Sequence, residues 1–501
     1  MSRILSEKYR SKVTSAEEAA RLIKNGDTVG FAGFTGSGYP KALPVALAGL
    51  IKAATARGEE FKINVLTGAS TAPELDGALA EAGGINMRMP YQSDPYMRNA
   101  INSGQSQYHD VHLSHSGPQV RAGYWGRLDF AVVEVTKIKA DGTIVPSSSI
   151  GNNNVYLEKA EKIILEVNSW QSEDLEGMHD LYSMHLPPHN NPIPILNAGD
   201  RIGETCYHID SDKVVAIIET DAPDRNTPFK DLDADSLAIA GHLLDFLGDE
   251  VKAGRIPKNL LPLQSGVGNI ANAVLAGLLE GPFEQLVSYT EVIQDGMVDL
   301  IDSGKLLVAS ATAFSLSPDA AERMNDRASF YREKIVMRPQ EISNNPEVIR
   351  RLGVISCNGL LEADIYGNVN STNVMGTKIQ NGIGGSGDFT RNASISSFVT
   401  PSTAKNGDIS CIVPMVSHHD HTEHDVMVVI TEQGLADLRG LSPKQRAQKI
   451  IDNCAHPDFK PMLQDYFDRS LATAKGIHTP HMLNEALSWH QRMLETGSMR
   501  V

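Results

Sequence analysis

Cysteine is scarce in this chain of 501 residues, and no CxxC pair occurs. The cysteines are Cys206, Cys357, Cys411 and Cys454. Thiols this far apart do not suggest a disulfide framework or a cysteine-rich zinc site, so a reduced, cytoplasmic protein is expected. Basic residues are also in the minority, at 45 against 61 acidic residues, which gives a net charge of −16. Sequence-independent nucleic-acid binding needs a basic face, so no nucleic-acid partner is expected.

Long hydrophobic runs are absent as well. No apolar run approaches the roughly 18 residues of a membrane-spanning helix, so no membrane partner is expected. The N-terminal stretch MSRILSEKYRSKVTSAEEAARL carries Glu7, Glu17 and Glu18 and has no long apolar core, unlike a signal or transit peptide. The overall composition, 41% hydrophobic and 21% charged, is that of a globular protein, and the length suggests about two to four domains.

Helix and strand patterns alternate along the chain. Ser15 followed by Glu18 forms a capping-box pattern at the start of a helix. TVGFAGF then predicts a strand, a second helix ends near Gly58, and KINVLTG predicts the next strand. The same order returns in NLLPLQSGVGNIANAVLAGLLEG, LVSYTEVIQDGMVDLIDSG and KLLVASATAF. The predicted fold class is therefore α/β, with two related open-sheet α/β domains.

The boundary between these domains is predicted near residue 220. The stretch 219–236, ETDAPDRNTPFKDLDADS, is polar, rich in turn residues and punctuated by proline. The predicted domains are therefore 1–220 and 221–501.

An acidic residue interrupts one of the predicted strand-to-helix segments. In SYTEVIQDGMVDLIDSG (288–304), Glu291 stands between Thr290 and Val292, where the chain should be entering its core. A loop that needed only charge could place any acid outside the apolar run, so a chemical role for this carboxylate is suggested. From the residues alone, Glu291 can also be read as a surface acid at the end of a strand.

Gly-rich loops follow several strand-like runs: FTGSGYPKALP (34–44), SGVGN (265–269) and GIGGSGDFTRN (382–392). Glycine lets backbone N–H groups approach a ligand, and successive N–H groups can form an anion-binding concavity. None of the loops has the G-x-x-x-x-G-K-[ST] pattern, and GSGYPK lacks the G-x-G-x-x-G spacing, so neither an NTPase nor a dinucleotide fold is supported. Each loop taken alone can also be no more than a tight turn.

The motifs TEVIQDGMVDL, QSGVGN, GGSGDF and TEQGLADLRG together resemble the acetyl-CoA hydrolase/transferase branch of the class I coenzyme A-transferases. The resemblance runs over essentially the whole chain and is nearest to members that exchange coenzyme A between succinate and acetate. It implies two α/β domains of the CoA-transferase type, each an open sheet flanked by helices, with the active site between them. A homodimer is expected.

The resemblance also implies roles for individual residues. Glu291 matches the catalytic glutamate, and Asn344 in ISNNPE matches a side-chain oxyanion donor. Val267 and Gly385 match backbone N–H donors to the carboxylate or acyl oxygen, and Glu432 matches a supporting residue near the active site. Residues that meet coenzyme A are expected at Arg225, Lys405, Gly266, Gly268 and Gly384. Without the resemblance, Arg225 and Lys405 would be read as solvated loop cations.

The expected reaction transfers coenzyme A from succinyl-CoA to acetate, giving acetyl-CoA and succinate. A free carboxylate attacks a thioester slowly, and an enzymic carboxylate divides the task through an acyl-glutamyl anhydride and a glutamyl-CoA thioester in a ping-pong sequence. Coenzyme A is then a substrate, and neither a prosthetic group nor a metal is expected. Propionate could replace acetate, or water could be the acceptor, which would make the protein a hydrolase. A non-catalytic acyl-CoA binding protein is disfavoured because a sensor needs no nucleophile.

Two histidine-rich stretches offer competing chemistry. SHHDHTEHD (417–425) contains His418, His419, His421 and His424, but it has no HExxH pattern and lies between the strand-like runs CIVPMV and VMVVI. A polar hairpin connection is therefore predicted there rather than a metal site. HDVHLSHSG (109–117) alternates like a strand, and its histidines are predicted to be structural.

Overall fold

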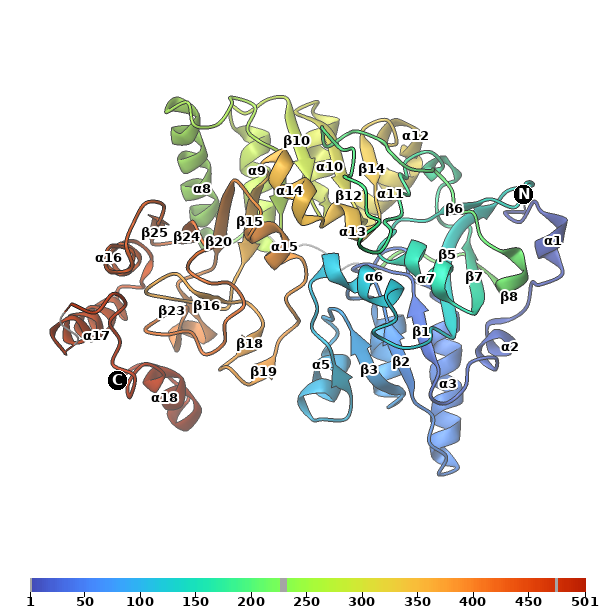
Figure 1. Ribbon diagram of the computed structural model, residues 1–501, viewed down its shortest axis with the longest axis horizontal. Helices are drawn as coiled ribbons and strands as arrows, with labels where there is room; N and C mark the ends of the chain where they lie inside the picture. Colours follow the sequence, from blue (N-terminus) through green and yellow to red (C-terminus); the bar gives the residue numbers. More distant parts are fainter. Residues whose placement is uncertain (1, 226–231, 474–475) are drawn as a thin grey trace. The chain divides into compact units, whose positions relative to one another are not determined.

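The computed structural model describes residues 2–225, 232–473 and 476–501. Its backbone divides into two compact units, the first formed by Met1–Pro228 with Val287–Leu352 and the second by Phe229–Leu286 with Gly353–Val501 (Figure 1). The predicted domain boundary near residue 220 stays a prediction. The two compact units divide the chain differently, because the first unit also includes a later segment, which contains Glu291. Part of the expected connection, 226–231, lies outside the described residues.

An eight-stranded sheet forms the centre of the first unit (Figure 1, blue to green). Its strands follow the order β4-β3-β2-β1-β5-β7-β8, and β6 pairs with β5. All these pairs are parallel except β5 with β6. The strands are β1 (Thr28–Phe31), β2 (Ile63–Leu66), β3 (Ile85–Met89), β4 (Gln107–Tyr108), β5 (Phe130–Ile138), β6 (Ile144–Pro146), β7 (Lys162–Asn168) and β8 (Val214–Thr220).

Helices pack on this sheet through their apolar faces. In α3 (Leu43–Ala56), Leu43, Leu47 and Ile51 are buried in one cluster with the strand residues of β1 and β2, as the spacing of a core-facing helix requires. Ser15 caps α2 by accepting a hydrogen bond from the Glu18 N–H at 3.2 Å, which confirms the serine half of the predicted capping box, whereas the Glu18 side chain accepts from Arg21. The helices of this segment are α1 (Glu7–Arg10), α2 (Ala16–Ala20), α3, the π-helical turn Pro73–Gly77, α4 (Ala78–Glu81), α5 (Pro95–Asn102), α6 (Leu113–Arg121) and α7 (Asn153–Lys159).

The later segment of the first unit, 287–352, adds further strands and helices. Strands β14, β12 and β10 are neighbours in this order, and β11 pairs with β13 in parallel. The strands are β10 (Leu286–Tyr289), β11 (Val292–Gln294), β12 (Leu306–Ala311), β13 (Ala313–Ser315) and β14 (Ile335–Met337). The helices are α10 (Asp295–Asp302), α11 (Pro318–Asp326), α12 (Ala328–Tyr331), α13 (Gln340–Ser343) and α14 (Pro346–Leu352).

The second unit is also built on parallel strands. β9, β15, β20 and β24 are neighbours in this order, and β25 closes the edge in antiparallel fashion. A small sheet of order β17-β16-β23 and the pairs β18–β19 and β21–β22 lie outside that set. The strands are β9 (Leu263–Ser265), β15 (Ile355–Gly359), β16 (Glu362–Asp364), β17 (Val369–Asn370), β18 (Asn373–Val374), β19 (Lys378–Ile379), β20 (Ile395–Val399), β21 (Thr403–Ala404), β22 (Ile409–Ser410), β23 (Ile412–Val413), β24 (Val428–Thr431) and β25 (Gly434–Asp437).

Helices and a continuous apolar cluster complete the second unit. The cluster joins β20, β23 and β24 to the helices that follow them in the sequence, with Phe398, Val429 and Ile451 all fully buried. The helices are α8 (Ala234–Lys252), α9 (Asn269–Glu280), α15 (Ser386–Thr390), α16 (Pro443–Cys454), α17 (Lys460–Thr473) and α18 (Ser488–Thr496). The described part of the chain contains no helix long and apolar enough to cross a bilayer.

The α/β prediction is confirmed, but two local predictions are wrong. Residues 113–117 open helix α6 instead of forming a strand, and 417–425 is not a hairpin. Strand β23 before that segment pairs with β16, whereas β24 after it pairs with β20 and β25. The histidine-rich segment therefore connects two different sheets.

Candidate active site

Glu291 lies at a bend between β10 and β11, and its backbone is fixed on both sides. The Thr290 N–H donates to the Ser310 carbonyl at 2.9 Å. The Glu291 carbonyl accepts from the N–H groups of Thr312 at 2.9 Å and Ala313 at 3.3 Å. Because both neighbours of Glu291 are buried while its own side chain is only half-buried, the strand end presents the carboxylate from a rigid support.

Asn344 holds that carboxylate. Its Nδ2 donates to Glu291 Oε1 at 2.8 Å, and its Oδ1 accepts from Ser343 Oγ at 2.8 Å. Since an ionised carboxylate only accepts, the NH₂ end of Asn344 is the one that faces Glu291, and its Oδ1 accepts from the Ser343 hydroxyl. Asn344 is fully buried at the end of α13. The predicted nucleophile and the predicted side-chain donor are therefore brought together.

Helix α13 is itself anchored by buried charge. Glu341 receives two hydrogen bonds from the Arg121 guanidinium, at 2.8 and 2.9 Å, and a third from Asn154 Nδ2 at 3.0 Å. The neighbouring Gln340 donates to Ser116 Oγ at 2.7 Å. Bidentate arginine–carboxylate pairs fix geometry as well as adding energy, so α13 has little freedom to carry Asn344 away from Glu291.

Arg225 follows β8 in the chain and is hydrogen-bonded to the Gly-rich loop that follows β1. Its N–H donates to the Gly36 carbonyl at 2.8 Å, and its guanidinium forms an ion pair with Glu74. Its side chain is 64% exposed, so a ligand can reach it. The residue before it, Asp224, accepts from the Gly38 N–H at 3.0 Å. Asp224 and Arg225 thus clamp both ends of the turn 36–38.

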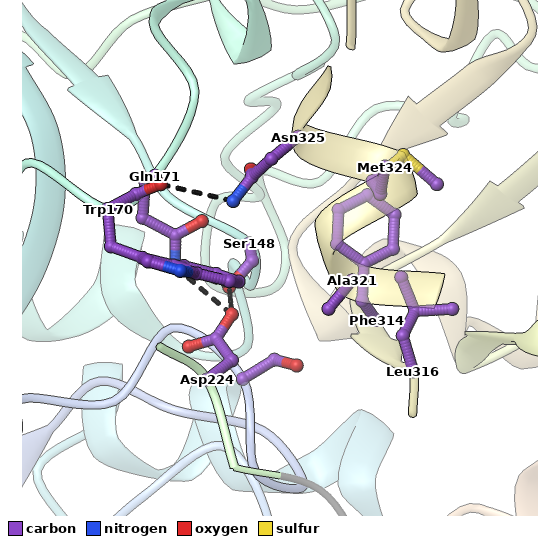
Figure 2. A pocket seen from close by; sticks show the side chains of 10 residues that line it. Ser148, Trp170, Gln171, Asp224, Phe314, Leu316, Ala321, Met324 and Asn325 are labelled. Carbon is purple, nitrogen blue, oxygen red and sulfur yellow. Dashed lines mark hydrogen bonds between the residues drawn. The ribbon is translucent and has the colours of Figure 1, made fainter. Parts of the chain in front are cut away.

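Asp224 also forms the polar wall of a small pocket in the first unit. Figure 2 shows its hydrogen bonds to Ser148 and Gln171, the second at 3.0 Å, with Trp170 beside them. Phe314, Leu316 and Met324 form the opposite, apolar wall. Phe314 belongs to β13, the strand paired with β11 directly after Glu291.

Asp224 also belongs to a buried cluster of three charged side chains. Lys41 Nζ lies 3.0 Å from Asp224 Oδ1 and also contacts Glu134, and all three side chains are at most 5% exposed. Burial works to lower the pKa of Lys41, but Asp224 and Glu134 outweigh it and hold the pKa above its usual value. Burial raises the pKa of Glu134 to about 7, against the opposing effect of Lys41, and the nearby Asp224 adds to the rise.

The loop 265–269 is predicted to supply backbone donors in the second unit. Gly266 donates its N–H to the Cys357 carbonyl at 3.0 Å, which ties the loop to β15. Gly268 has φ of 118°, a conformation that favours glycine, and it precedes α9. Val267 is 60% exposed, and its N–H finds no acceptor within the described residues. A ligand oxygen can therefore be bound there.

The turn 383–386 also contains a backbone N–H that a ligand oxygen can bind. Gly384 has φ of 58°, and the turn closes through Ser386, whose N–H and Oγ both donate to the Ile383 carbonyl, at 3.2 and 2.8 Å. Across the part of the chain that the structure describes, no acceptor is found for the N–H of Gly385. Each predicted oxyanion donor in the second unit thus has a backbone N–H available for a ligand.

Glu432 and Lys405 belong to neighbouring loops of the second unit. Burial works to raise the pKa of Glu432, but hydrogen bonds from Ser402 and Gln433 outweigh it and hold the pKa below its usual range. The Ser402 N–H donates to Glu432 at 2.7 Å. Lys405 follows on the exposed turn between the paired strands β21 and β22, with φ of 53°. Its ammonium makes no ion pair among the residues that the structure describes.

Sequence reasoning missed the residues that support these groups. Nothing in the sequence marked Ser343 as the residue that orients Asn344, or Asp224 and Lys41 as the pair behind Arg225.

Comparison with known proteins places the chain in a family. The acetyl-CoA hydrolase/transferase N-terminal domain matches residues 2–219, and the C-terminal domain of the same family matches residues 321–467. This chain belongs to the acetyl-CoA hydrolase/transferase family, a family of enzymes. The predicted family resemblance is confirmed.

Several curated relatives cover nearly the whole chain. The succinyl-CoA:acetate CoA-transferase of Clostridium kluyveri is 52% identical over 99% of this chain and 92% of its own length. The propanoyl-CoA:succinate CoA transferase of Escherichia coli is 45% identical over 97% of this chain and 98% of its own length. An acetyl-CoA hydrolase of Schizosaccharomyces pombe is 45% identical over 100% of this chain and 98% of its own length.

A solved structure shows the same fold. RipA from Yersinia pestis matches with a TM-score of 0.72 at 24% identity, covering 93% of this chain and 98% of RipA.

Proposed function

We propose that this protein transfers coenzyme A from succinyl-CoA to acetate through a covalent intermediate on Glu291. The observation that carries the proposal is the Glu291 carboxylate held at 2.8 Å by the buried amide of Asn344, on a backbone pinned by β12 and β13. A surface acid at a strand end would need neither restraint. The Clostridium kluyveri relative, whose name states this reaction, supports the choice of substrates.

The reaction then proceeds through two acyl exchanges on one carboxylate. Glu291 attacks the thioester carbonyl of succinyl-CoA, the carbon–sulfur bond breaks, and a succinyl-glutamyl anhydride and coenzyme A thiolate result. The thiolate attacks the glutamyl carbonyl, releases succinate and leaves a glutamyl-CoA thioester. Acetate repeats the sequence in reverse, so acetyl-CoA leaves and the Glu291 carboxylate is restored.

Each exchange passes through a tetrahedral oxyanion that needs donors. Asn344 Nδ2 supplies one in this proposal, together with the N–H groups of Val267 and Gly385, which have no acceptor among the residues that the structure describes. Such donors are fixed before the reaction, and removing one from an oxyanion hole typically costs about 3 to 4 kcal/mol in the barrier. Glu432 acts in a supporting role, since its oxygens are occupied by Ser402 and Gln433.

Coenzyme A is bound in this proposal by exposed cations and glycine loops. Arg225 and Lys405 meet the anionic groups of coenzyme A, and Gly266, Gly268 and Gly384 let the backbone come close to it. The exposure of both cations supports this assignment. A homodimer, a cytoplasmic location and the lack of a prosthetic group stay predictions.

The test is capture of the covalent intermediate. Incubation with succinyl-CoA alone should release succinate and leave the protein heavier by coenzyme A less one water, with the adduct on the peptide that contains Glu291. Glu291→Gln should give no adduct, whereas Glu432→Gln should still form one. An adduct on another peptide, or turnover without any adduct, would refute the mechanism.

Two alternative activities use the same covalent chemistry, and they differ only in the acceptor, which is water in one and propionate in the other. If water is the acceptor, as the name of the Schizosaccharomyces pombe relative indicates for that protein, thiol release from succinyl-CoA should be equally fast with and without acetate. If propionate is preferred to acetate, its kcat/KM should exceed that of acetate by about 10- to 200-fold, the range that one methylene supports in an apolar pocket.

A further inference from the structure

One of the four histidines of the segment 417–425 is built into the second unit's core. His421 is 3% exposed, whereas His418, His419 and His424 are exposed. Its backbone forms an antiparallel bridge with Val369, with hydrogen bonds of 2.8 and 3.1 Å in the two directions. Its ring lies 4.8 Å from the ring of Phe398 on β20. The bridge with Val369 therefore fixes the backbone of His421, and the contact with Phe398 fixes its ring.

The neighbouring Asp420 fixes the same segment from the other side. Its carboxylate accepts from the Ser371 N–H at 2.7 Å and from Thr372 Oγ1 at 2.9 Å. Asp420 thereby ties the connection between the two sheets to the residues after β17. Asp420 and the bridge to Val369 therefore fix the backbone on which His421 stands.

The His421 imidazole reaches the turn that contains Gly385. Its Nε2 lies 3.1 Å from Ser386 Oγ and 3.4 Å from Ser371 Oγ, and the Ser386 hydroxyl lies 2.8 Å from the Ile383 carbonyl. A carbonyl only accepts, so the Ser386 hydroxyl donates to Ile383 and accepts from His421 Nε2–H. This order of donors satisfies both contacts at once.

We propose that His421 is a positioning residue that holds the turn 383–386 so that the Gly385 N–H faces the reacting acyl oxygen. This inference rests on the proposed function, in which the Gly385 N–H is a donor to the oxyanion. The hydrogen bonds from Ser386 to the Ile383 carbonyl close the turn around the Gly384–Gly385 peptide, which carries the Gly385 N–H, so a shift of Ser386 lets that N–H change direction. A displacement of about 1 Å in a catalytic group can cost about 10²-fold in rate.

The test uses two substitutions at His421 and one at a matched site. His421→Phe keeps a ring beside Phe398 but removes the donor, and should lower kcat by about 10- to 100-fold with little change in the KM for succinyl-CoA. His421→Gln keeps an N–H donor and should recover most of the activity. His424→Phe, the same change at an exposed histidine of the segment, should leave kcat unchanged.

A second variant covers the case in which His421→Phe does not fold. Ser386→Ala removes the hydroxyl that joins His421 to the turn, and it should lower kcat in the same way, with little change in the KM for succinyl-CoA. Normal kcat in a folded His421→Phe or in Ser386→Ala, or a loss that His421→Gln does not relieve, would overturn the inference. Failure of the proposed function has a different signature, since Glu291→Gln would then stay active.

Discussion

A carboxylate attacks a thioester efficiently only when one of its oxygens is presented in a fixed direction, and Glu291 is restrained at both ends. Its carbonyl accepts from Thr312 and Ala313, and its Oε1 accepts from Asn344. Ser343 sets the orientation of the Asn344 amide. These restraints act before substrate binds, which is how an active site avoids reorganisation during the reaction.

Shortening this side chain by one methylene tests the role of distance. Glu291→Asp keeps the charge but withdraws the carboxylate by roughly 1 Å, so kcat for succinyl-CoA plus acetate should fall by about 10²-fold or more. The thermal midpoint should stay close to that of the natural protein, because the hydrogen bonds of the Glu291 carbonyl do not involve the side chain. Near-normal turnover with an unchanged midpoint would show that Glu291 is not the nucleophile.

At this scale the sequence could predict the reacting groups but not their supports. Glu291 stood out because an acid interrupts an apolar strand pattern, and the family motifs pointed to Asn344. Ser343 could not be found in this way, because a single hydroxyl has no periodicity and its effect depends on which amide it meets in the fold. The same holds for Ser386 and His421, whose contact joins residues far apart in the chain.

Among the secondary-structure elements, two neighbouring strands of the first sheet carry buried acidic residues at paired positions. Glu134 on β5 contacts Lys41, and Glu166 on β7 accepts from the N–H groups of Ala42 and Leu43 at 3.0 and 3.3 Å. Glu166 thereby caps the first turn of α3. The Gly-rich loop after β1 is thus held by acids that come from two neighbouring strands.

Removing the buried Lys41 ammonium should lower the free energy of unfolding much more than removing the exposed Lys52 ammonium. Lys41→Met leaves Glu134 and Asp224 buried without their partner, which should destabilise the protein by about 3 to 5 kcal/mol. Lys52→Met breaks the exposed pair with Glu81 and should stay within about 0.5 kcal/mol. The midpoint of denaturant unfolding, measured for both variants, tests this difference in stability. Equal midpoints would mean that the contacts of Lys41 with Glu134 and Asp224 contribute little to stability.

The raised pKa of Glu134 predicts a pH-dependent stability. Between the ordinary glutamate pKa of about 4.5 and the folded pKa of about 7, the unfolded chain loses the Glu134 proton while the folded protein keeps it. Stability from this group is therefore fully present at low pH and is lost as the pH rises toward 7. Glu134→Gln removes the titration, so its thermal midpoint relative to the natural protein should rise between pH 5 and pH 8. A constant difference over that range would contradict the assignment.

Element types were predictable where the pattern was long. The strands and helices around residues 28–66 and 263–315 follow their apolar spacing and their glycine turns. The stretch 109–117 failed because its helix buries small polar residues: Leu113, Ser116, Gly117 and Val120 have helical spacing, but only two of them are apolar. The stretch 417–425 failed because a sequence does not show which sheet a strand joins.

For the whole molecule, the negative net charge disfavours long-range attraction of the proposed substrate, succinyl-CoA. Coenzyme A is a polyanion, and the chain carries a net charge of −16, so long-range attraction cannot provide the binding. Binding must then come from a few cations placed at the surface. Arg225 and Lys405 have the exposure that this requires.

Removing either cation should weaken coenzyme A binding selectively. Arg225→Ala and Lys405→Ala should each raise the KM for succinyl-CoA by about tenfold, which corresponds to the about 1.5 kcal/mol of a weak charge-assisted hydrogen bond, and should leave the KM for acetate unchanged. Arg57→Ala is the control, because Arg57 is an arginine of similar exposure that is also paired with a glutamate, Glu59. Rising salt should raise the KM for succinyl-CoA in the natural protein and do so less in the two variants, since screening removes an attraction they already lack. Equal changes in both KM values, or none, would mean that Arg225 and Lys405 are solvated loop cations and that coenzyme A is held by backbone groups alone.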